Sequence, residues 1–329
     1  MKFLVAGAGA IGAYIGAKMV RTGLDVTLFA RGPHLHAMQE QGIRVKSPDG
    51  DFHVHPRVVG SLDESGPADV VFLGVKAHSL PQLAPQLKPV LRPDTTVVST
   101  QNGIPWWYFQ GIGGEAEGIH LESVDPAGTI SAAIDARRVV GSIVYFSTEI
   151  PAPGVIQHTD GNRISIGEPD GTRSDRCRQI AEALIGSGLR CPVTTHIRQE
   201  IWVKLLGNAS FNPISALTRA TLGEMVRDPG IAALIRNIMQ EVEAVARKMG
   251  MEMPVSIDQR MAGAEKVGAH KTSMLQDLEA GRPLELEALV GAVVELGERL
   301  NLPMQSTRTV YSCVKLLAQR SAPPSPARK

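Results

Sequence analysis

Three glycines near the N-terminus constrain the fold of this 329-residue chain more than any other feature, because Gly7, Gly9 and Gly12 follow the spacing G-x-G-x-x-G. The apolar run over residues 2–6 precedes them and is typical of a strand buried in a parallel sheet. A helical pattern follows, and a second strand is expected over residues 25–30. Strand, glycine turn, helix and strand within about 30 residues predict the βαβ unit that binds a dinucleotide.

In such a unit each glycine has a physical task. Gly7 permits the tight turn, Gly9 lets backbone amides approach a pyrophosphate, and Gly12 permits close packing of the helix, whose dipole favours the anion. A glycine-rich turn that binds no ligand is the alternative interpretation. The residues expected to contact the cofactor in this turn are Gly7, Ala8, Gly9, Ala10, Ile11 and Gly12.

The end of the second strand determines which dinucleotide fits. In NAD-binding versions an acidic residue at this point takes the ribose hydroxyls, whereas this chain has Arg31. Because a guanidinium suits a 2′-phosphate, we predict NADP(H) as the cofactor. An ordinary arginine in a surface turn is the alternative.

Two more candidates follow expected strands of the same domain, which also contains a strand expected over residues 54–59. Lys76 comes directly after the strand at residues 68–75, and Asn102 follows the strand at residues 95–100. Ligands of such sheets lie beyond the carboxyl ends of the strands, so Lys76 is a candidate cofactor ligand and Asn102 a candidate for cofactor and substrate. An exposed lysine and a plain Asn-Gly turn are equally open alternatives.

The whole pattern predicts an α/β protein with two domains. Strand-like runs at residues 138–147, 154–159, 163–167 and 190–194, with a helix at residues 174–187, complete an N-terminal Rossmann-type domain over residues 1–195. Helical patterns at residues 196–217, 230–249, 257–270, 273–280, 284–300 and 307–318 predict an all-α C-terminal domain over residues 196–320. Residues 321–329 are rich in proline and serine and are expected to form a disordered tail.

A polar stripe marks the first helix of the second domain. Lys204, Asn208 and Asn212 are four residues apart and share one helical face, while most residues between them are apolar. An ammonium beside two carboxamides suits a substrate with carbonyl, hydroxyl or carboxylate oxygens. A lysine at its ordinary pKa of about 10.4 is protonated at neutral pH and can act as an acid without tuning. A solvated face of a surface helix is the alternative.

Two candidates lie nearer the C-terminus. Ser273 stands three residues before Gln276, which predicts a capping box, but a hydroxyl at a helix start also binds carboxylates. Pro283 is expected to begin the next helix and to place Glu285 in its first turn, where the helix dipole stabilises an acid. For Ser273 and Glu285 these local structural roles stay open beside substrate binding.

Composition excludes several classes of protein. A formal net charge of +1 with 20% charged residues offers no basic surface for nucleic acid, and no run of about 18 apolar residues predicts a membrane span. Cys177, Cys191 and Cys313 form neither a disulfide framework nor a metal site, so a reducing cytoplasm is expected. The Trp106-Trp107-Tyr108 run either walls a pocket or packs a loop.

Together these residues resemble the ketopantoate reductase (2-dehydropantoate 2-reductase) family. The resemblance covers nearly the whole chain, from the glycine turn through Gln101-Asn102-Gly103 to the Lys-x3-Asn-x3-Asn-Pro helix and the Ser-Met-Leu-Gln-Asp run. It implies NADPH-dependent reduction of a 2-oxo acid in pantothenate biosynthesis, with a lysine general acid, a glutamate on the substrate hydroxyl, and asparagine and serine ligands. The matching residues are Lys204 and Glu285 for catalysis and Asn102, Asn208, Asn212 and Ser273 for substrate binding.

Departures from the family pattern concern the substrate. Leu284-Glu-Leu-Glu287 stands where Thr-Glu-Ile-Asp is commoner, so a related 2-oxo acid is as compatible with this chain as 2-dehydropantoate. A 3-hydroxyacid or opine-type dehydrogenase and a non-catalytic NADP(H) sensor are the alternative functions. The oligomeric state is open, and a homodimer is one assembly that we consider.

Overall fold

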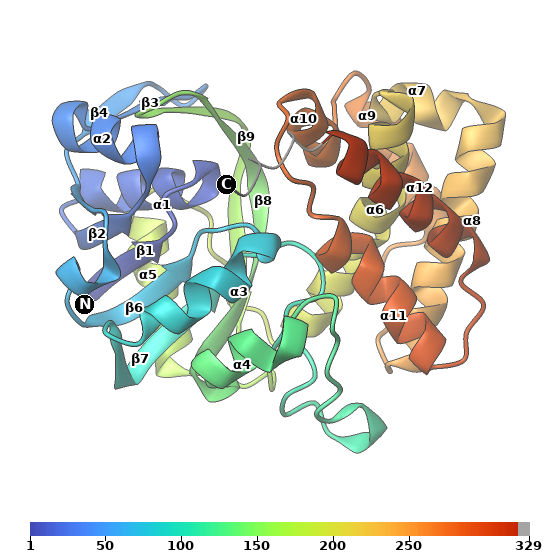
Figure 1. Cartoon of the computed structure of the whole chain (residues 1–329), viewed down its shortest axis with the longest axis horizontal. Coiled ribbons are helices and arrows are strands. Elements are labelled where there is room, and N and C mark those ends of the chain that lie inside the picture. The colour runs from blue at the N-terminus through green and yellow to red at the C-terminus, as the bar shows by residue number, and fades with distance from the viewer. Residues whose placement is uncertain (322–329) are drawn as a thin grey trace, which may run out of the picture. The chain divides into compact units, whose positions relative to one another are not determined.

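The computed structural model describes residues 1–321 and divides the chain into two compact units (Figure 1). The sheet unit comprises Met1–Gln101, Pro105–His120 and Asp125–Arg198, and the helical unit comprises Asn102–Ile104, Leu121–Val124 and the chain from Gln199 onward. The predicted α/β class, a Rossmann-type domain followed by a helical domain, is confirmed. The expected disordered tail lies, from residue 322 on, outside the described residues.

The sheet unit is built on nine strands in the order β4-β3-β9-β8-β7-β6-β1-β2-β5. At its centre β1 is parallel to both β2 and β6. The chain moves from β1 to β2 in one direction across the sheet and from β6 to β7 in the other, so right-handed crossovers place their helices on opposite faces. The strands are β1 Lys2–Ala6, β2 Asp25–Phe29, β3 Ile43–Lys46, β4 Phe52–Val54, β5 Arg57–Val59, β6 Ala68–Leu73, β7 Leu91–Ser99, β8 Val139–Ala152 and β9 Val155–Gly167.

Helices cover this sheet. The first of them, α1, is buried along most of its length because apolar side chains such as Ile15 and Met19 alternate with small residues that let it approach the strands. Gly16 is one of these, since a Cβ there would stand 2.8 Å from a methyl carbon of Leu28. The helices are α1 Ala10–Arg21, α2 Gly32–Gln41, α3 Leu80–Leu83, α4 Thr129–Ala133 and α5 Asp175–Gly186.

Four expected strands differ from the sequence prediction. The strand expected over residues 54–59 is interrupted at Pro56, which lacks an amide donor, so that β4 pairs with β3 while β5 pairs with β2. The strands expected at residues 154–159 and 163–167 form the single strand β9, because the glycine at 161 (φ +73°) and register shifts against β8 let the ladder continue. The strand expected at residues 190–194 is reduced to isolated bridges.

The helical unit is organised around α8, which packs against α7, α9, α11 and α12. Its buried side chains Ile235, Ile238, Met239 and Val242 recur at helical spacing and bury one face. The helices are α6 Ile197–Thr218, α7 Leu222–Arg227, α8 Pro229–Lys248, α9 Ile257–Val267, α10 Ser273–Glu279, the π turn η7 Glu287–Gly291, α11 Ala292–Arg299 and α12 Gln305–Ser321. Within residues 1–321, no helix has both the length and the apolar character that a membrane crossing requires.

Two local predictions near the C-terminus are wrong. Thr272, not Ser273, is the N-cap of α10, because its hydroxyl accepts a hydrogen bond from the Leu275 amide at 3.2 Å. Glu285 does not lie in a helical turn, since helical structure begins only at Leu286. The preceding chain is instead tied to α10 by Arg282, whose Nε donates to Asp277 at 2.9 Å.

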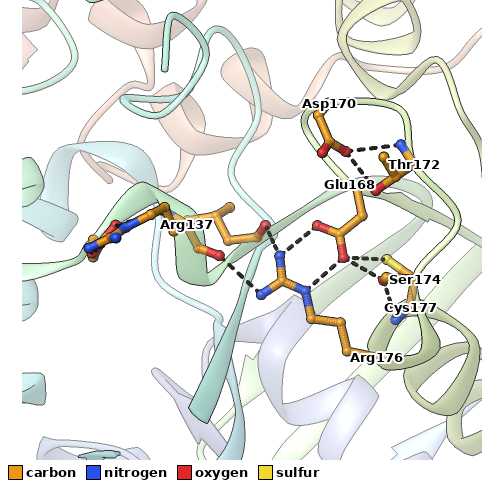
Figure 2. Close-up of polar contacts among 9 residues, drawn as sticks. Arg137, Glu168, Asp170, Thr172, Ser174, Arg176 and Cys177 are labelled. Carbon is orange, nitrogen blue, oxygen red and sulfur yellow. Dashed lines mark hydrogen bonds and ion pairs between the residues drawn. The ribbon is translucent and has the colours of Figure 1, made fainter. Parts of the chain in front are cut away.

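A buried carboxylate joins the end of β9 to α5 (Figure 2). Glu168 is only 4% exposed, and its two oxygens accept hydrogen bonds of 2.7 and 2.6 Å from the guanidinium of Arg176. The Ser174 hydroxyl donates to the same carboxylate at 2.5 Å and, as N-cap of α5, accepts from the Cys177 amide. The acid is thus fully engaged in fixing the start of α5.

This network predicts an asymmetric response to two arginine substitutions. Arg176→Met leaves Glu168 charged, buried and without its ion-pair partner, so we expect the free energy of unfolding to fall by about 3 to 5 kcal/mol in urea titrations. Arg178→Met, on the same helix, removes an exposed pair with Asp175 and should cost less than about 0.5 kcal/mol. Equal losses in the two variants would contradict the account.

Candidate active site

The glycine turn lies where the strand order reverses, between β1 and β6. Gly7 has φ +106°, and a Cβ there would stand 2.3 Å from the Val75 side chain. A Cβ on Gly12 would stand 2.3 Å from the Gly7 carbonyl oxygen. In contrast, a Cβ on Gly9 would meet nothing closer than 3.5 Å. The first and third glycines are therefore required for packing, whereas the middle one leaves backbone open to an approaching group.

Backbone amides in this turn fall into two sets. Those of Gly7 and Ala8 donate to the Phe29 carbonyl at 3.2 and 2.8 Å, so they fix the turn to β2. Gly9 is the N-cap of α1 and offers no side-chain cap, which leaves the positive end of the helix to the amides of Ala10, Ile11 and Gly12. This arrangement fits a dinucleotide pyrophosphate.

A fourth glycine belongs to the turn and was missed in the sequence. A Cβ on Gly74 would stand 2.3 Å from the Gly7 carbonyl oxygen and 3.0 Å from Gly12 Cα. Gly74 directly follows β6, so the strand that lies beside β1 must also end in a residue without a side chain. A glycine at the carboxyl end of an expected buried strand was the signal for it.

Arg31 and Lys76 lie just past the carboxyl ends of β2 and β6, as their sequence positions predicted. Arg31 is exposed, its Cζ stands 5.2 Å over the Phe29 ring, and its Nη2 donates to Gln86 Oε1 at 2.9 Å. Gln86, which the sequence did not single out, therefore orients the guanidinium. Lys76 is half-buried and precedes the short helix η2 Ala77–Ser79.

In the helical unit, Lys204 on α6 is hydrogen-bonded to Asn102, 102 residues earlier in the chain. Its Nζ donates to Asn102 Oδ1 at 2.7 Å. Asn102 is followed by Gly103, at φ +86°, where a Cβ would stand 2.1 Å from the Ala288 carbonyl oxygen, and that oxygen accepts from the Ile104 amide at 3.1 Å. The Asn-Gly pair thus lies in a bend, and its asparagine accepts the hydrogen bond of the lysine.

Ala288 lies in the π turn η7, three residues after Glu285. Such turns are rare and recur at functional sites. Here the turn supplies the carbonyl that holds the Asn102–Ile104 segment, while Glu285, 9% exposed, lies close enough for its charge to act on Lys204. The segment before α11 therefore contributes both an anchor and an acid.

The pKa of Lys204 is lowered to about 8, which corrects the expectation of an untuned lysine. Burial of the ammonium is the largest cause, the charge of Glu285 opposes it, and the charge of Arg260 adds to it. A lysine with this pKa remains largely protonated at neutral pH and gives up its proton far more readily than an exposed lysine.

The remaining stripe residues are shielded from solvent to different degrees. Asn208 is half-buried and Asn212 is 5% exposed, so the interpretation of the stripe as a solvated face does not fit. Ser273 is exposed at the first residue of α10. Substrate binding by Asn208, Asn212 and Ser273 stays a prediction.

The aromatic run belongs to the core of the sheet unit. Trp107 and Tyr108 are at most 1% exposed, and a Cβ on Gly141 would stand 2.7 Å from the Trp107 ring. Arg198 fixes the run by donating to the Tyr108 carbonyl at 2.9 Å. Trp106 also borders a groove of about 1580 Å³ in this unit, but none of the expected site residues lines that groove.

The cysteines offer no reactive thiolate in the sheet unit. Burial raises the pKa of Cys177 to about 11 and that of Cys191 to about 12. In residues 1–321 no group of three or more His, Cys, Asp or Glu side chains is arranged to hold a metal ion.

Comparison with known proteins agrees with this geometry. Family models described as ketopantoate reductase PanE/ApbA and its C-terminal domain match residues 3–171 and 196–318. The chain is 48% identical to a 2-dehydropantoate 2-reductase of Mesorhizobium japonicum, over 97% of this chain and 98% of that one.

Solved structures are also similar to this chain over nearly its whole length. The 2-dehydropantoate 2-reductase from Methylococcus capsulatus is 30% identical, with a TM-score of 0.82 and 98% coverage of both chains. A D-mandelate dehydrogenase with NADH and anilino(oxo)acetate is 19% identical, with a TM-score of 0.83 over 98% of this chain and 99% of that one, and shares the fold.

A glycine turn at the reversal point of a parallel sheet, together with a lysine-bearing helical unit, defines a dinucleotide-dependent oxidoreductase. The chain belongs to the ketopantoate reductase family. The resemblance inferred from the sequence and the oxidoreductase class are thereby confirmed.

The lowered pKa of Lys204 predicts the pH dependence of ketone reduction. If the protonated lysine is required, kcat/KM stays constant below pH 8 and falls about tenfold per pH unit above it, because the free enzyme loses its proton donor. Initial rates of cofactor oxidation with a 2-oxo acid across pH 6 to about 10 would measure this. If kcat/KM falls only near the ordinary lysine pKa of about 10.4, burial does not lower the pKa of the required group, and the prediction is wrong.

Proposed function

We propose that the protein reduces a 2-oxo acid, 2-dehydropantoate or a close relative, with NADPH as hydride donor and Lys204 as general acid. The observation that carries this proposal is the Lys204 ammonium, held at 2.7 Å by Asn102 and with its pKa lowered to about 8. The 2-dehydropantoate 2-reductase that is 48% identical supports the substrate class.

When bound, the reduced nicotinamide supplies a hydride to the ketone carbon. Lys204 donates a hydrogen bond to the ketone oxygen, stabilises the negative charge that develops there, and transfers its proton to that oxygen. The carbonyl becomes a secondary hydroxyl, and the lysine regains a proton from solvent. The amides at the start of α1 hold the pyrophosphate and, together with Lys76, orient the dinucleotide.

Asn102 and Glu285 support the acid in different ways. Because Asn102 Oδ1 accepts from Lys204, its amide NH2 is directed away from the lysine and provides a donor for a substrate oxygen. Glu285 keeps the ammonium charged despite burial and accepts from the substrate hydroxyl. Asn208, Asn212 and Ser273 complete the ligands of the substrate hydroxyl and carboxylate in this proposal.

Replacing the lysine should separate turnover from cofactor binding. Lys204→Ala should lower kcat by about 10²- to 10⁴-fold, the usual worth of a general acid, while the Kd of NADPH stays within about twofold. Lys248→Ala, at the exposed end of α8, is the control and should change neither quantity. Near-normal turnover of Lys204→Ala would refute the assignment.

The preference for NADP(H) rests on Arg31 beyond β2. Arg31→Asp should lower the ratio of kcat/KM for NADPH to that for NADH at least tenfold, because a carboxylate repels the 2′-phosphate and accepts from ribose hydroxyls. Gln86→Ala, which removes only the partner of the guanidinium, should lower the ratio less. The control Arg178→Asp makes the same charge change at an exposed side chain of α5 and should leave the ratio unchanged. An unchanged ratio in Arg31→Asp would contradict the assignment of Arg31 to the 2′-phosphate.

The reaction itself is tested by measuring the loss of NADPH absorbance with each member of a panel of 2-oxo acids. Turnover of at least one of them is expected, with 2-dehydropantoate among the good substrates. Tight NADPH binding without turnover of any member would favour the sensor function instead. The homodimer and the cytoplasmic location stay predictions beside this proposal.

A further inference from the structure

The chain beyond the end of β6 contains the glycine that completes the glycine turn. A Cβ on Gly74 would stand 2.3 Å from the Gly7 carbonyl oxygen, so this position excludes every side chain. Glycine is also the residue whose backbone has the greatest conformational freedom. The place of Gly74 therefore depends on contacts that restrain the chain on either side of it.

The backbone ladder between β6 and β7 does not reach this glycine. Its last pair joins Leu73 to Ser99, one residue before Gly74. On the other side of β6, the Ala6 carbonyl of β1 accepts a hydrogen bond from the Gly74 amide at 3.0 Å. On the β7 side, a side chain takes the place of the ladder.

That side chain belongs to Gln101, which is half-buried and follows β7 by two residues. Its Nε2 donates to the Leu73 carbonyl at 2.8 Å and to the Val75 carbonyl at 2.9 Å. Because a peptide group is planar, these two bonds fix the group that leads into Gly74 and the group that joins Val75 to Lys76. One amide therefore restrains the chain both before and after the glycine.

Two neighbouring hydroxyls support this arrangement. The Ser99 hydroxyl, on a residue that is 2% exposed, donates to Gln101 Oε1 at 2.9 Å, which directs the NH2 group of the amide toward β6. Thr100 Oγ1 donates to the Leu73 carbonyl at 2.6 Å. Thr100 thus holds the chain before the glycine, whereas Gln101 holds it on both sides.

Val75 connects this restraint to the glycine turn. A Cβ on Gly7 would stand 2.3 Å from Cγ1 of Val75 and 2.9 Å from its amide nitrogen, so the Val75 backbone lies directly against Gly7. Lys76, the candidate cofactor ligand, is the next residue. Any movement of Val75 therefore changes both the wall of the glycine turn and the direction in which the chain enters Lys76.

We infer that Gln101 is a positioning residue of the dinucleotide site, which it serves by holding residues 73–75 against the glycine turn. The inference rests on the proposed function for its ligand, NADPH. Without the amide, the chain around Gly74 samples other conformations, and only the fraction of molecules with the turn intact binds the cofactor. Saturating cofactor restores that conformation, so the dissociation constant should change far more than kcat.

The first test replaces the amide with an apolar side chain of similar length. Gln101→Met should raise the Kd of NADPH about tenfold, as expected if about a tenth of the molecules keep the segment in place. The value of kcat at saturating cofactor should change less than about threefold. Fluorescence titration with NADPH and initial rates measure the two quantities.

Gln157 on β9 provides a matched control. It is also half-buried, and its Nε2 likewise donates to two backbone carbonyls, those of Lys46 at 3.4 Å and His158 at 3.2 Å. Its bonds restrain the β3–β9 part of the sheet and not the glycine turn. Gln157→Met should therefore leave the Kd of NADPH within about twofold of the wild-type value.

Hydrogen exchange followed by mass spectrometry gives a readout that does not depend on turnover. Without cofactor, peptides that cover residues 73–79 should exchange faster in Gln101→Met than in the wild type, and saturating NADPH should slow their exchange again. Peptides from β8 and β9 should exchange at the wild-type rate, because the change loosens one segment and leaves the rest of the sheet folded.

An unchanged Kd in Gln101→Met would overturn the inference and leave the proposed function standing. Equal rises in Kd for Gln101→Met and Gln157→Met, or faster exchange throughout the sheet unit, would also overturn it, because either would show a general loss of stability. A higher Kd with wild-type exchange in residues 73–79 would rule out positioning. A wild-type protein that does not bind NADPH would defeat the proposed function and this inference together.

Discussion

One hydrogen bond, from Lys204 Nζ to Asn102 Oδ1, joins two segments of the helical unit that are 102 residues apart in the chain. Asn102 follows the end of β7 by three residues, Lys204 lies on α6, and both residues belong to the helical unit. The bond forms because Gly103, lacking a side chain and at positive φ, lets its backbone touch the Ala288 carbonyl in the π turn. A Cβ at this point would stand 2.1 Å from that carbonyl oxygen, so the path of the segment that carries Asn102 depends on a glycine.

Close approach of neighbouring groups also sets the pKa of Lys204. Burial destabilises the charged form of Lys204 and so lowers its pKa. The charge of Glu285 raises the pKa, and the charge of Arg260, whose guanidinium lies against Gly207, lowers it further. The pKa of about 8 is the balance of these three effects, and it is compatible with the general-acid role that we propose for Lys204. Glycines at 103 and 207 thus shape the field around Lys204 by allowing close approach of neighbouring groups.

Much of this architecture was readable in the sequence, because the βαβ unit and the helical stripe are local patterns with fixed periods. The steric need for Gly7 and Gly12 and the burial of Asn212 follow from those patterns. Glu285 was expected in a helical turn, but the π turn that begins after it depends on contacts with a segment about 180 residues earlier, which periodicity does not encode. Arg260 was missed for the same reason, since its neighbour on α6 is set by tertiary packing. The available signal was Gly207, an isolated glycine inside a helical pattern, which often marks a close approach.

A crystal structure of the enzyme with NADP⁺ and the hydroxy acid product tests the central claim most directly. The account predicts that the new hydroxyl oxygen lies within about 3.2 Å of Lys204 Nζ, on a lysine still bonded to Asn102, with the product carbon facing the nicotinamide. A product bound with its hydroxyl away from Lys204, and with another side chain at that distance, would contradict it.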